Sequence, residues 1–179
     1  MYDRRIIGVP GWRIGPTTSQ AQVQVLDSDG VKALRLRAPV NLTAPPRPPE
    51  PGVVVPPTFV FQTIKADKYR KQRVRFAGEI MVEDSAEASL FIRVDFDLYR
   101  AIAARDSWCV SGPTSWSEAS MVLDVSERAG WITLGLSVTG GGTAHMRRLT
   151  FEVVDDTVPT TDNPISKALD TLHNMDFQF

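Results

Sequence analysis

The sequence has very few of the residues that build disulfide frameworks, zinc sites and nucleophile triads. It contains one cysteine, Cys109, so no internal disulfide can form, which fits a reducing compartment. Its two histidines, His145 and His173, lie neither in a nucleophile motif nor at zinc-ligand spacing. These shortages exclude a disulfide-stapled fold and leave no local signature of a hydrolase or a zinc centre.

An excess of one charge and long apolar runs are also missing. The chain has 20 Lys and Arg against 21 Asp and Glu, a formal net charge of −1, so it lacks the basic surplus that nucleic acid or an anionic membrane requires. No apolar stretch near the N-terminus resembles a signal peptide or a membrane span. We therefore expect a cytoplasmic protein whose partner is a small-molecule ligand or substrate.

The sequence is rich in short runs in which apolar and polar residues alternate. These runs are bounded by Gly, Pro, Asp and Ser, a pattern that is typical of strands. About eight such runs predict an all-β fold, a two-sheet antiparallel jelly-roll sandwich. Turns at 27–30 and 140–142 are predicted to close hairpins. The expected strands cover 22–26, 33–37, 58–64, 73–82, 88–97, 117–125, 131–138 and 144–154.

Residues 1–160 are expected to form one β-sandwich domain, followed by a C-terminal tail at 161–179. The segment 39–57 holds eight prolines, so it is expected to be an extended loop, either a plain surface loop or a lid over a site. Residues 98–113 are expected to cross one end of the sandwich. In the tail, Asn163 and Pro164 are suitable to start a short helix.

Five stretches, in order along the chain, resemble a bacterial β-sandwich family that is similar to carbohydrate-binding modules and occurs attached to arabinose-operon-type regulators. The resemblance implies a jelly roll and no established activity. The stretches are Tyr69–Gly78, Leu90–Asp95, Gly112–Trp116, Met121–Val125 and Leu149–Val154.

Two departures from that family bear on function. Ala103 and Ala104 stand where the family has an Asp-Asn pair, and His145 and Arg147 stand where it has Trp and Asp. Because sugar platforms rely on planar aromatics, amides and carboxylates, these changes favour a more apolar pocket than a sugar site.

The candidate site is chosen from residues that alternate with the expected core residues along each strand and so face away from the core. His145 is a candidate proton-transfer group. Arg93 or Arg147 is a candidate holder of a carboxylate or enolate, and Asp95 is a candidate to orient one of these two arginines. His145, Arg93 and Asp95 are the predicted catalytic residues, and a plain solvated charged face is the alternative. The predicted substrate-binding residues are Gln62, Glu79, Phe91, Trp108 and Arg147.

Two functions follow from this reading. The first is a cofactor-independent cyclase or isomerase of secondary metabolism that shapes a flexible substrate in an apolar pocket. The second is a noncatalytic carbohydrate- or ligand-binding module, which could also serve as a sensor. No metal or cofactor is expected, although calcium at scattered carboxylates, such as those of the 27–30 turn, and a homodimer both stay open.

Overall fold

The computed structural model describes residues 4–5, 9–16, 20–39, 57–84, 86–97, 100–106 and 109–161, and for 4–5, 97 and 100–106 it describes the backbone alone. Within these residues every helix-or-strand element is a strand, and no helix is present that could cross a membrane. The Pro-rich loop, apart from its two end residues, the C-terminal helix expected after Asn163, and Trp108 lie outside the described residues.

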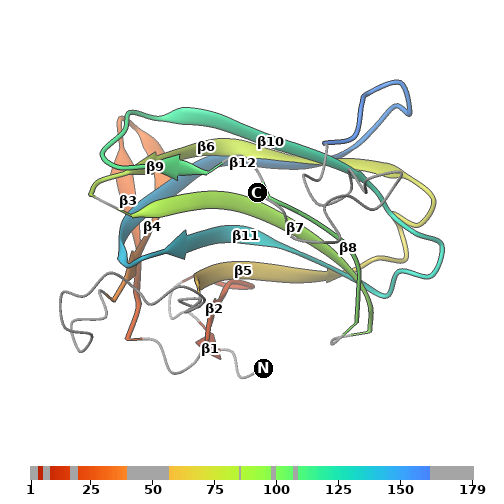
Figure 1. The fold of residues 1–179 in the computed structure, drawn as a ribbon, viewed down its shortest axis with the longest axis horizontal. Coiled ribbons are helices and arrows are strands. Elements are labelled where there is room, and N and C mark those ends of the chain that lie inside the picture. Colours follow the sequence, from red (N-terminus) through yellow and green to blue (C-terminus); the bar gives the residue numbers. More distant parts are fainter. Residues whose placement is uncertain are drawn as a thin grey trace, which may run out of the picture.

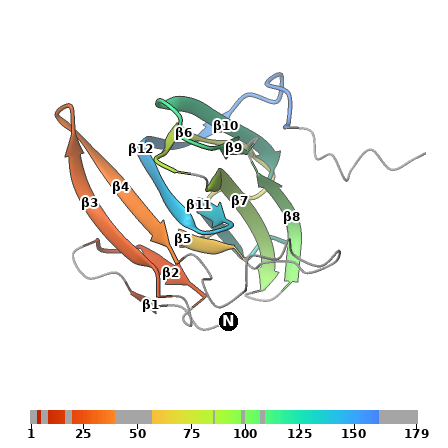
Figure 2. The same cartoon turned by 60° about the vertical axis from the view of Figure 1, so that its left-hand side comes forward.

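Two antiparallel sheets form the molecule (Figure 1), and Figure 2 shows them as separate layers. One sheet has the order β1-β2-β5-β11-β7-β8, with β9 also paired to β7, and the other has the order β10-β6-β12-β4-β3. The seven strands of the first sheet are β1 (Arg4–Arg5), β2 (Arg13–Gly15), β5 (Thr58–Lys65), β7 (Glu87–Asp97), β8 (Arg100–Asp106), β9 (Val110–Ser111) and β11 (Trp131–Thr139). The five strands of the second are β3 (Gln22–Ser28), β4 (Val31–Ala38), β6 (Arg73–Val82), β10 (Ser117–Asp124) and β12 (Gly142–Val154).

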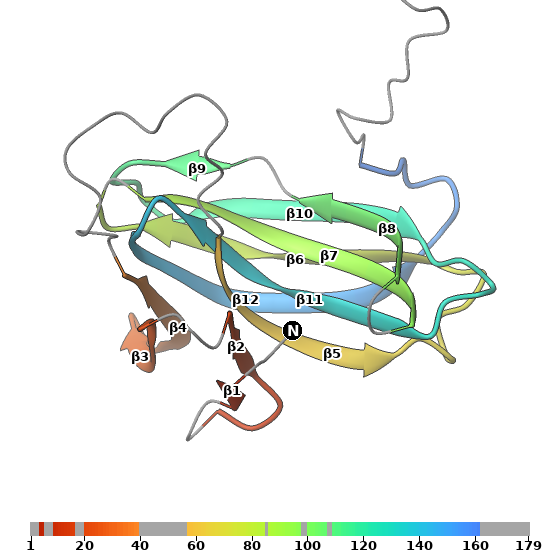
Figure 3. The same cartoon turned by 60° about the horizontal axis from the view of Figure 1, so that its bottom comes forward.

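The predicted all-β jelly-roll sandwich is confirmed. From β5 to β7 and from β9 to β12 the chain changes sheet at every step, so strands that follow one another stack across the core instead of pairing. Figure 3 shows the long strands of both layers running in the same general direction, as in an aligned sandwich. All eight expected strands are present, with ends that differ by no more than two residues.

The core lies between the layers and is built from alternate residues of both sheets. Val74, Phe76 and Ile80 of β6 face Leu90 and Ile92 of β7, and all five side chains are almost completely buried. Period-two alternation produces this arrangement because each strand turns every second side chain inward. The intervening side chains of each sheet consequently form two outer faces.

One turn was predicted correctly and one was not. The turn Asp29–Gly30 joins the paired strands β3 and β4, with φ angles of 55° and 75° that suit an Asp-Gly hairpin turn. Gly140 and Gly141 also have positive φ, but they join β11 to β12, which lie in opposite sheets, so the predicted hairpin there is wrong. Turn residues report local backbone geometry and do not specify which strand the next one will pair with.

The expectation that 98–113 merely crosses one end of the sandwich is also wrong, because β8 and β9 lie within it and both pair with β7. Residues 100–106 read Arg-Ala-Ile-Ala-Ala-Arg-Asp, which has little of the β-branched and aromatic character of a strand. Pairing with the long β7 edge, and not intrinsic propensity, places this segment in the sheet.

Candidate functional site

The residues predicted to form one site lie on two opposite faces of the sandwich. We call the outer surface of the seven-stranded sheet the β7 face and the outer surface of the five-stranded sheet the β12 face. Phe91, Arg93 and Asp95 belong to the β7 face, since they alternate with the buried Leu90, Ile92 and Val94. The β12 face carries the remaining described candidates, with one exception; these are Glu79, His145 and Arg147.

The exception is Gln62, which turns inward. In register it is paired with Leu134, a core residue of β11, so its side chain shares the inner side of the sheet. A Cβ placed on Gly11 would lie 3.4 Å from its Nε2 atom, which locates the amide beneath the turn at residues 9–12. Gln62 is therefore on the opposite side of its sheet from Arg93.

The β7 face is a regular grid, because β5, β11 and β7 are paired in continuous antiparallel register. Reading across the three strands gives four successive rows of outward residues. The rows are Phe59-Ser137-Ser89, Phe61-Gly135-Phe91, Thr63-Thr133-Arg93 and Lys65-Trp131-Asp95. Aromatic rings, hydroxyl groups and charged groups thus alternate over a short distance on one surface.

The hydroxyl groups of this grid are held close to the sheet. Ser89, Thr133 and Ser137 are only 7%, 8% and 8% exposed, although they lie on an outer face. Thr63 and Thr133 share a hydrogen bond of 3.0 Å between their Oγ1 atoms, which fixes both hydroxyls across the β5–β11 pair. Such short side chains lose little rotamer entropy when they are positioned in this way.

The aromatic groups of the grid stand around a position without a side chain. Phe59 and Phe91 pack edge to face, with ring centroids 5.5 Å apart and planes at 70°. Gly135 lies between Phe61 and Phe91 in register. A Cβ on this glycine would come 2.0 Å from the Val60 carbonyl oxygen, so close approach of β5 and β11 requires glycine there.

The charged corner of the grid is an ion pair with one buried partner. The Nε atom of Arg93 lies 2.9 Å and 3.0 Å from the two carboxylate oxygens of Asp95. Asp95 is 2% exposed, whereas the Arg93 side chain is 34% exposed, so the carboxylate is the fixed member and the guanidinium reaches the surface. The backbone of Asp95 is also held, because its carbonyl accepts a hydrogen bond from Gly130 N, directly before Trp131.

The β12 face consists of charges that neutralise one another. Arg147 Nε and Arg148 Nη1 donate to the two carboxylate oxygens of Glu79 at 2.6 and 2.7 Å. The hydrogen bond from Arg147 is the main reason that the pKa of Glu79 lies below its ordinary value. Consecutive strand residues normally face opposite ways, but a bulge after Arg147, with φ of 52° at Arg148, turns both guanidinium groups toward Glu79.

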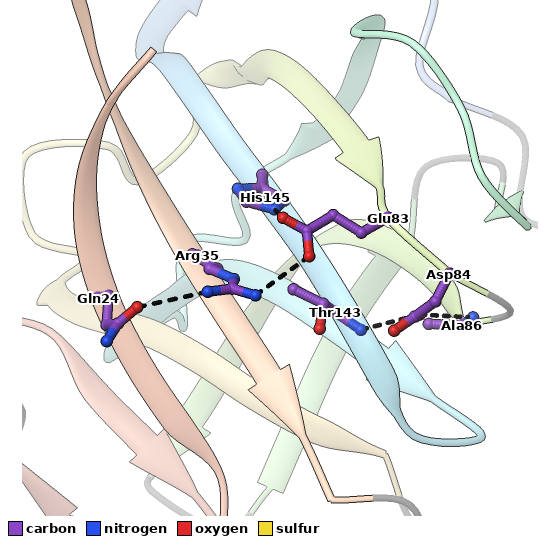
Figure 4. A network of polar contacts seen from close by, with 7 residues as sticks. All are labelled: Gln24, Arg35, Glu83, Asp84, Ala86, Thr143 and His145. Atoms are coloured by element: carbon purple, nitrogen blue, oxygen red, sulfur yellow. Dashed lines mark hydrogen bonds and ion pairs between the residues drawn. The ribbon is translucent and has the colours of Figure 1, made fainter.

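His145 belongs to a second polar network on the same face (Figure 4). Its Nε2 atom lies 2.7 Å from Glu83 Oε1, and Arg35 Nη2 donates to the other oxygen of that carboxylate at 3.1 Å. Arg35 Nη1 in turn lies 3.5 Å from Gln24 Oε1. His145 is 4% exposed, so this imidazole offers little surface to a ligand.

An aromatic ring covers the Arg147 end of the β12 face. The Arg147 guanidinium lies over the ring of Trp116 with Cζ 4.0 Å from the centroid, a cation–π contact. The ring of Trp116 also meets His145 edge to face at 6.1 Å. The candidates of this face are consequently occupied by one another.

No group of three or more metal-ligating side chains comes together in the part of the chain that the structure describes. The carboxylate of the 27–30 turn that was left open for calcium has internal partners. Asp27 Oδ1 accepts a hydrogen bond from Gly30 N at 2.9 Å, and Oδ2 lies 3.0 Å from Lys32 Nζ.

Comparison with known proteins places this architecture. No family model matches the chain. Solved structures with the same fold include the C-terminal family 22 carbohydrate-binding module of Clostridium thermocellum Xyn10B, with a TM-score of 0.57 and 12% identity over 85% of this chain and 91% of that one. The CBM22-2 xylan-binding domain of Paenibacillus barcinonensis Xyn10C gives a TM-score of 0.56 and 8% identity over 82% and 93%. The chain thus has the β-sandwich fold of these carbohydrate-binding modules.

Two further matches extend beyond the length of this sandwich. The chain is 32% identical over 123 residues to the uncharacterized HTH-type transcriptional regulator YbfP of Bacillus subtilis (strain 168), covering 66% of this chain and 42% of that protein. It also matches the enzymatically active domain of tailspike protein 4 of bacteriophage CBA120, with a TM-score of 0.56 and 12% identity over 81% of this chain and 20% of that one. The chain thus spans less than half the length of either.

The prediction of a cyclase or isomerase is wrong. Solved structures that share this sandwich over about nine-tenths of their length include carbohydrate-binding modules, which agrees with the alternative prediction. The geometry gives the physical reason, because His145 lies on the β12 face while Arg93 and Asp95 lie on the β7 face, with the core between them. These three groups cannot act on one small substrate.

The sandwich also carries candidate residues that the sequence did not single out. Trp131, Thr133, Ser89 and Ser137 complete the β7 face around Arg93. Their alternation was visible in the sequence, but the information that β11 lies between β5 and β7 was not. Without that strand order, no residue of β11 could be placed beside Arg93 or Asp95.

Proposed function

We propose that this protein is a noncatalytic carbohydrate-binding module that takes its ligand on the β7 face. The observation that carries the proposal is the grid in which Phe59, Phe91 and Trp131 are interleaved with fixed hydroxyls and with the Arg93–Asp95 pair. The fold shared with carbohydrate-binding modules supports it.

The chemistry of the grid matches the chemistry of a sugar. A pyranose ring has apolar C–H faces and a rim of hydroxyls, so it is recognised by flat apolar rings with polar groups between them. The half-buried rings of Phe59, Phe91 and Trp131 supply the first requirement. Arg93 supplies the second, and a hydrogen bond from a charged donor contributes about 1.5–3 kcal/mol.

The β12 face is a weaker candidate because its polar groups already have partners. A sugar that displaced the contacts of Glu79 would have to break two charge-assisted hydrogen bonds, from Arg147 and Arg148. Arg147 also lies over the ring of Trp116, which would otherwise offer a stacking surface.

The two tryptophans make a matched test. We expect Trp131→Ala to weaken oligosaccharide binding about tenfold or more, since it removes a ring from the grid, and Trp116→Ala to leave the affinity within about twofold. Isothermal titration with xylohexaose, galactotriose and a wider oligosaccharide panel measures both. If Trp116→Ala abolishes binding and Trp131→Ala does not, the site is on the other face; if no oligosaccharide binds the wild-type chain, the proposed function is wrong.

Use of the same site for sensing is the second candidate, favoured by the relative that is named as a transcriptional regulator. In this case, exchanging the matching part of that regulator for this chain should make its reporter transcription respond to the oligosaccharide that the chain binds. Transcription that is indifferent to a sugar bound by the hybrid would contradict the sensing role and leave the binding role intact.

A further inference from the structure

We infer that the sugar recognised on the β7 face is acidic and that its carboxylate binds the terminal nitrogens of Arg93; this rests on the proposed function and names the class of its ligand. The inference is carried by the way in which Arg93 is held, by its neighbours in the grid, and by the contrast with other arginines of the chain.

Arg93 is anchored through the inner end of its guanidinium alone. Its Nε atom contacts both oxygens of the buried Asp95 at 2.9 and 3.0 Å. Its Nη1 and Nη2 atoms make no hydrogen bond or ion pair within the described part of the chain, and the side chain is 34% exposed. The fixed carboxylate therefore sets the position of a two-nitrogen edge that is open at the surface.

Other arginines use their terminal nitrogens within the protein. Arg73 places Nε and Nη2 on Asp124 and directs Nη1 to the carbonyls of Asp156 and Val158. Arg75 holds Glu152 through Nε and Nη2. Both of these are complete structural pairs, whereas Arg93 retains the pair of donors that matches a carboxylate bidentately.

The surroundings of Arg93 favour an anion at this corner. Lys65 is exposed and in register with Trp131, so the last two rows of the grid carry two cations against the single carboxylate of Asp95. The residue of β8 in register with Arg93 is Ala104, which contributes no charged group.

The geometry suits a uronic acid residue. Its ring provides the apolar face for Trp131, and its carboxylate projects from the rim, where the two Arg93 nitrogens would meet both oxygens. A neutral hexose has a hydroxymethyl group in that place. This group can accept one hydrogen bond but cannot form the bidentate, charge-assisted pair of hydrogen bonds that a carboxylate forms with a guanidinium group.

The test compares each acidic oligosaccharide with its own carboxyl-reduced form. Oligogalacturonates, glucuronic-acid-substituted xylo-oligosaccharides and oligoglucuronates are titrated into the wild-type chain before and after reduction of the carboxyl to the alcohol. We expect at least one acidic member to bind about tenfold or more tightly than its reduced form, and the difference to shrink as salt is raised. A sulfated oligosaccharide that binds more tightly than every uronate overturns the assignment of a carboxylate.

Variants locate the preference. Arg93→Gln retains a donor for Asp95 but loses the bidentate pair of donors, so it should lose the tenfold preference while it still binds the reduced form. Arg93→Ala combined with Asp95→Ala removes both charges of the Arg93–Asp95 pair and should behave in the same way if Arg93→Gln folds poorly. Arg75→Gln on the β12 face is the matched control and should keep the preference.

The outcomes separate this inference from the function on which it rests. If acidic and reduced forms bind equally, or if Arg93→Gln weakens both by the same factor, the acidic ligand is wrong and carbohydrate binding stands. If neither form of any member binds, the proposed function fails and this inference with it.

Discussion

The two outer faces of this sandwich follow the same strand alternation but use their polar residues differently. On the β12 face, Glu79 and Glu83 are each held by two basic side chains. On the β7 face, Arg93 is fixed by Asp95 at one end and open at the other. A charged face that satisfies itself stabilises the sheet, and one that leaves donors open beside aromatic rings is suited to bind.

The difference also shows why equal residue types are poor evidence for a site. Both faces contain a tryptophan and an arginine within the same few rows. The ring of Trp116 has Arg147 over it, while Trp131 lies beside Asp95 and Lys65 in register with no such contact in the described residues. Contacts decide which of the two is available to a ligand.

The largest expected effect on the free energy of unfolding comes from substituting Gly135, the glycine at the centre of the β7 face. Gly135→Ala places a methyl group against the backbone oxygen of Val60, which cannot move without separating β5 from β11. We expect about 3 kcal/mol of lost stability, measured by urea denaturation. Gly78→Ala in the five-stranded sheet should cost less, because its closest neighbour is the end of the flexible Leu149 side chain. Equal losses would contradict this ranking of the two sheets.

A smaller effect separates the buried ion pair from an exposed one. Asp95→Asn replaces a buried charged acceptor and should lower the free energy of unfolding by about 1–2 kcal/mol. Glu152→Gln removes the partner of Arg75 in a pair that is exposed on both sides and should change it by about 0.5 kcal/mol or less. Denaturation midpoints of both variants check this, and a larger loss for Glu152→Gln would reverse the comparison.

The smallest effect is a pH dependence that belongs to the β12 face. The pKa of Glu79 is lowered in the folded chain, chiefly by the hydrogen bond from Arg147. Its contribution to stability is therefore present above the ordinary glutamate pKa and is lost as the pH falls through the lowered, folded value. Glu79→Gln should flatten the acid limb of stability against pH without altering sugar binding. An unchanged acid limb would show that Glu79 contributes nothing to it.

Much of the fold was predictable from the sequence, because alternation in β6 and β7 marks the inward residues directly. The strand β8 was not, since the run of alanines and charges at 100–106 is a strand only by pairing with β7. The turn at Gly140–Gly141 had the correct local geometry and the wrong partner.

The candidate site was predictable only in part, for the same reason. The sequence placed Arg93 and Asp95 on one face and assigned Asp95 to orient an arginine, and the structure contains that pair. It could not show that His145 and Arg147 lie on the other sheet, nor that Trp131 stands next to Asp95. The alternation of inward and outward residues along one strand can be seen in its own sequence. Which strands lie beside it depends on the topology of the whole chain.

The most direct test of the account is to map a bound oligosaccharide onto the two faces. Backbone amide shifts of the isotopically labelled chain are followed by NMR during titration with the oligosaccharide that binds most tightly. The account predicts changes concentrated on β5, β7 and β11, around Phe91, Arg93 and Trp131. Changes concentrated instead around Trp116, His145 and Arg147 would contradict it.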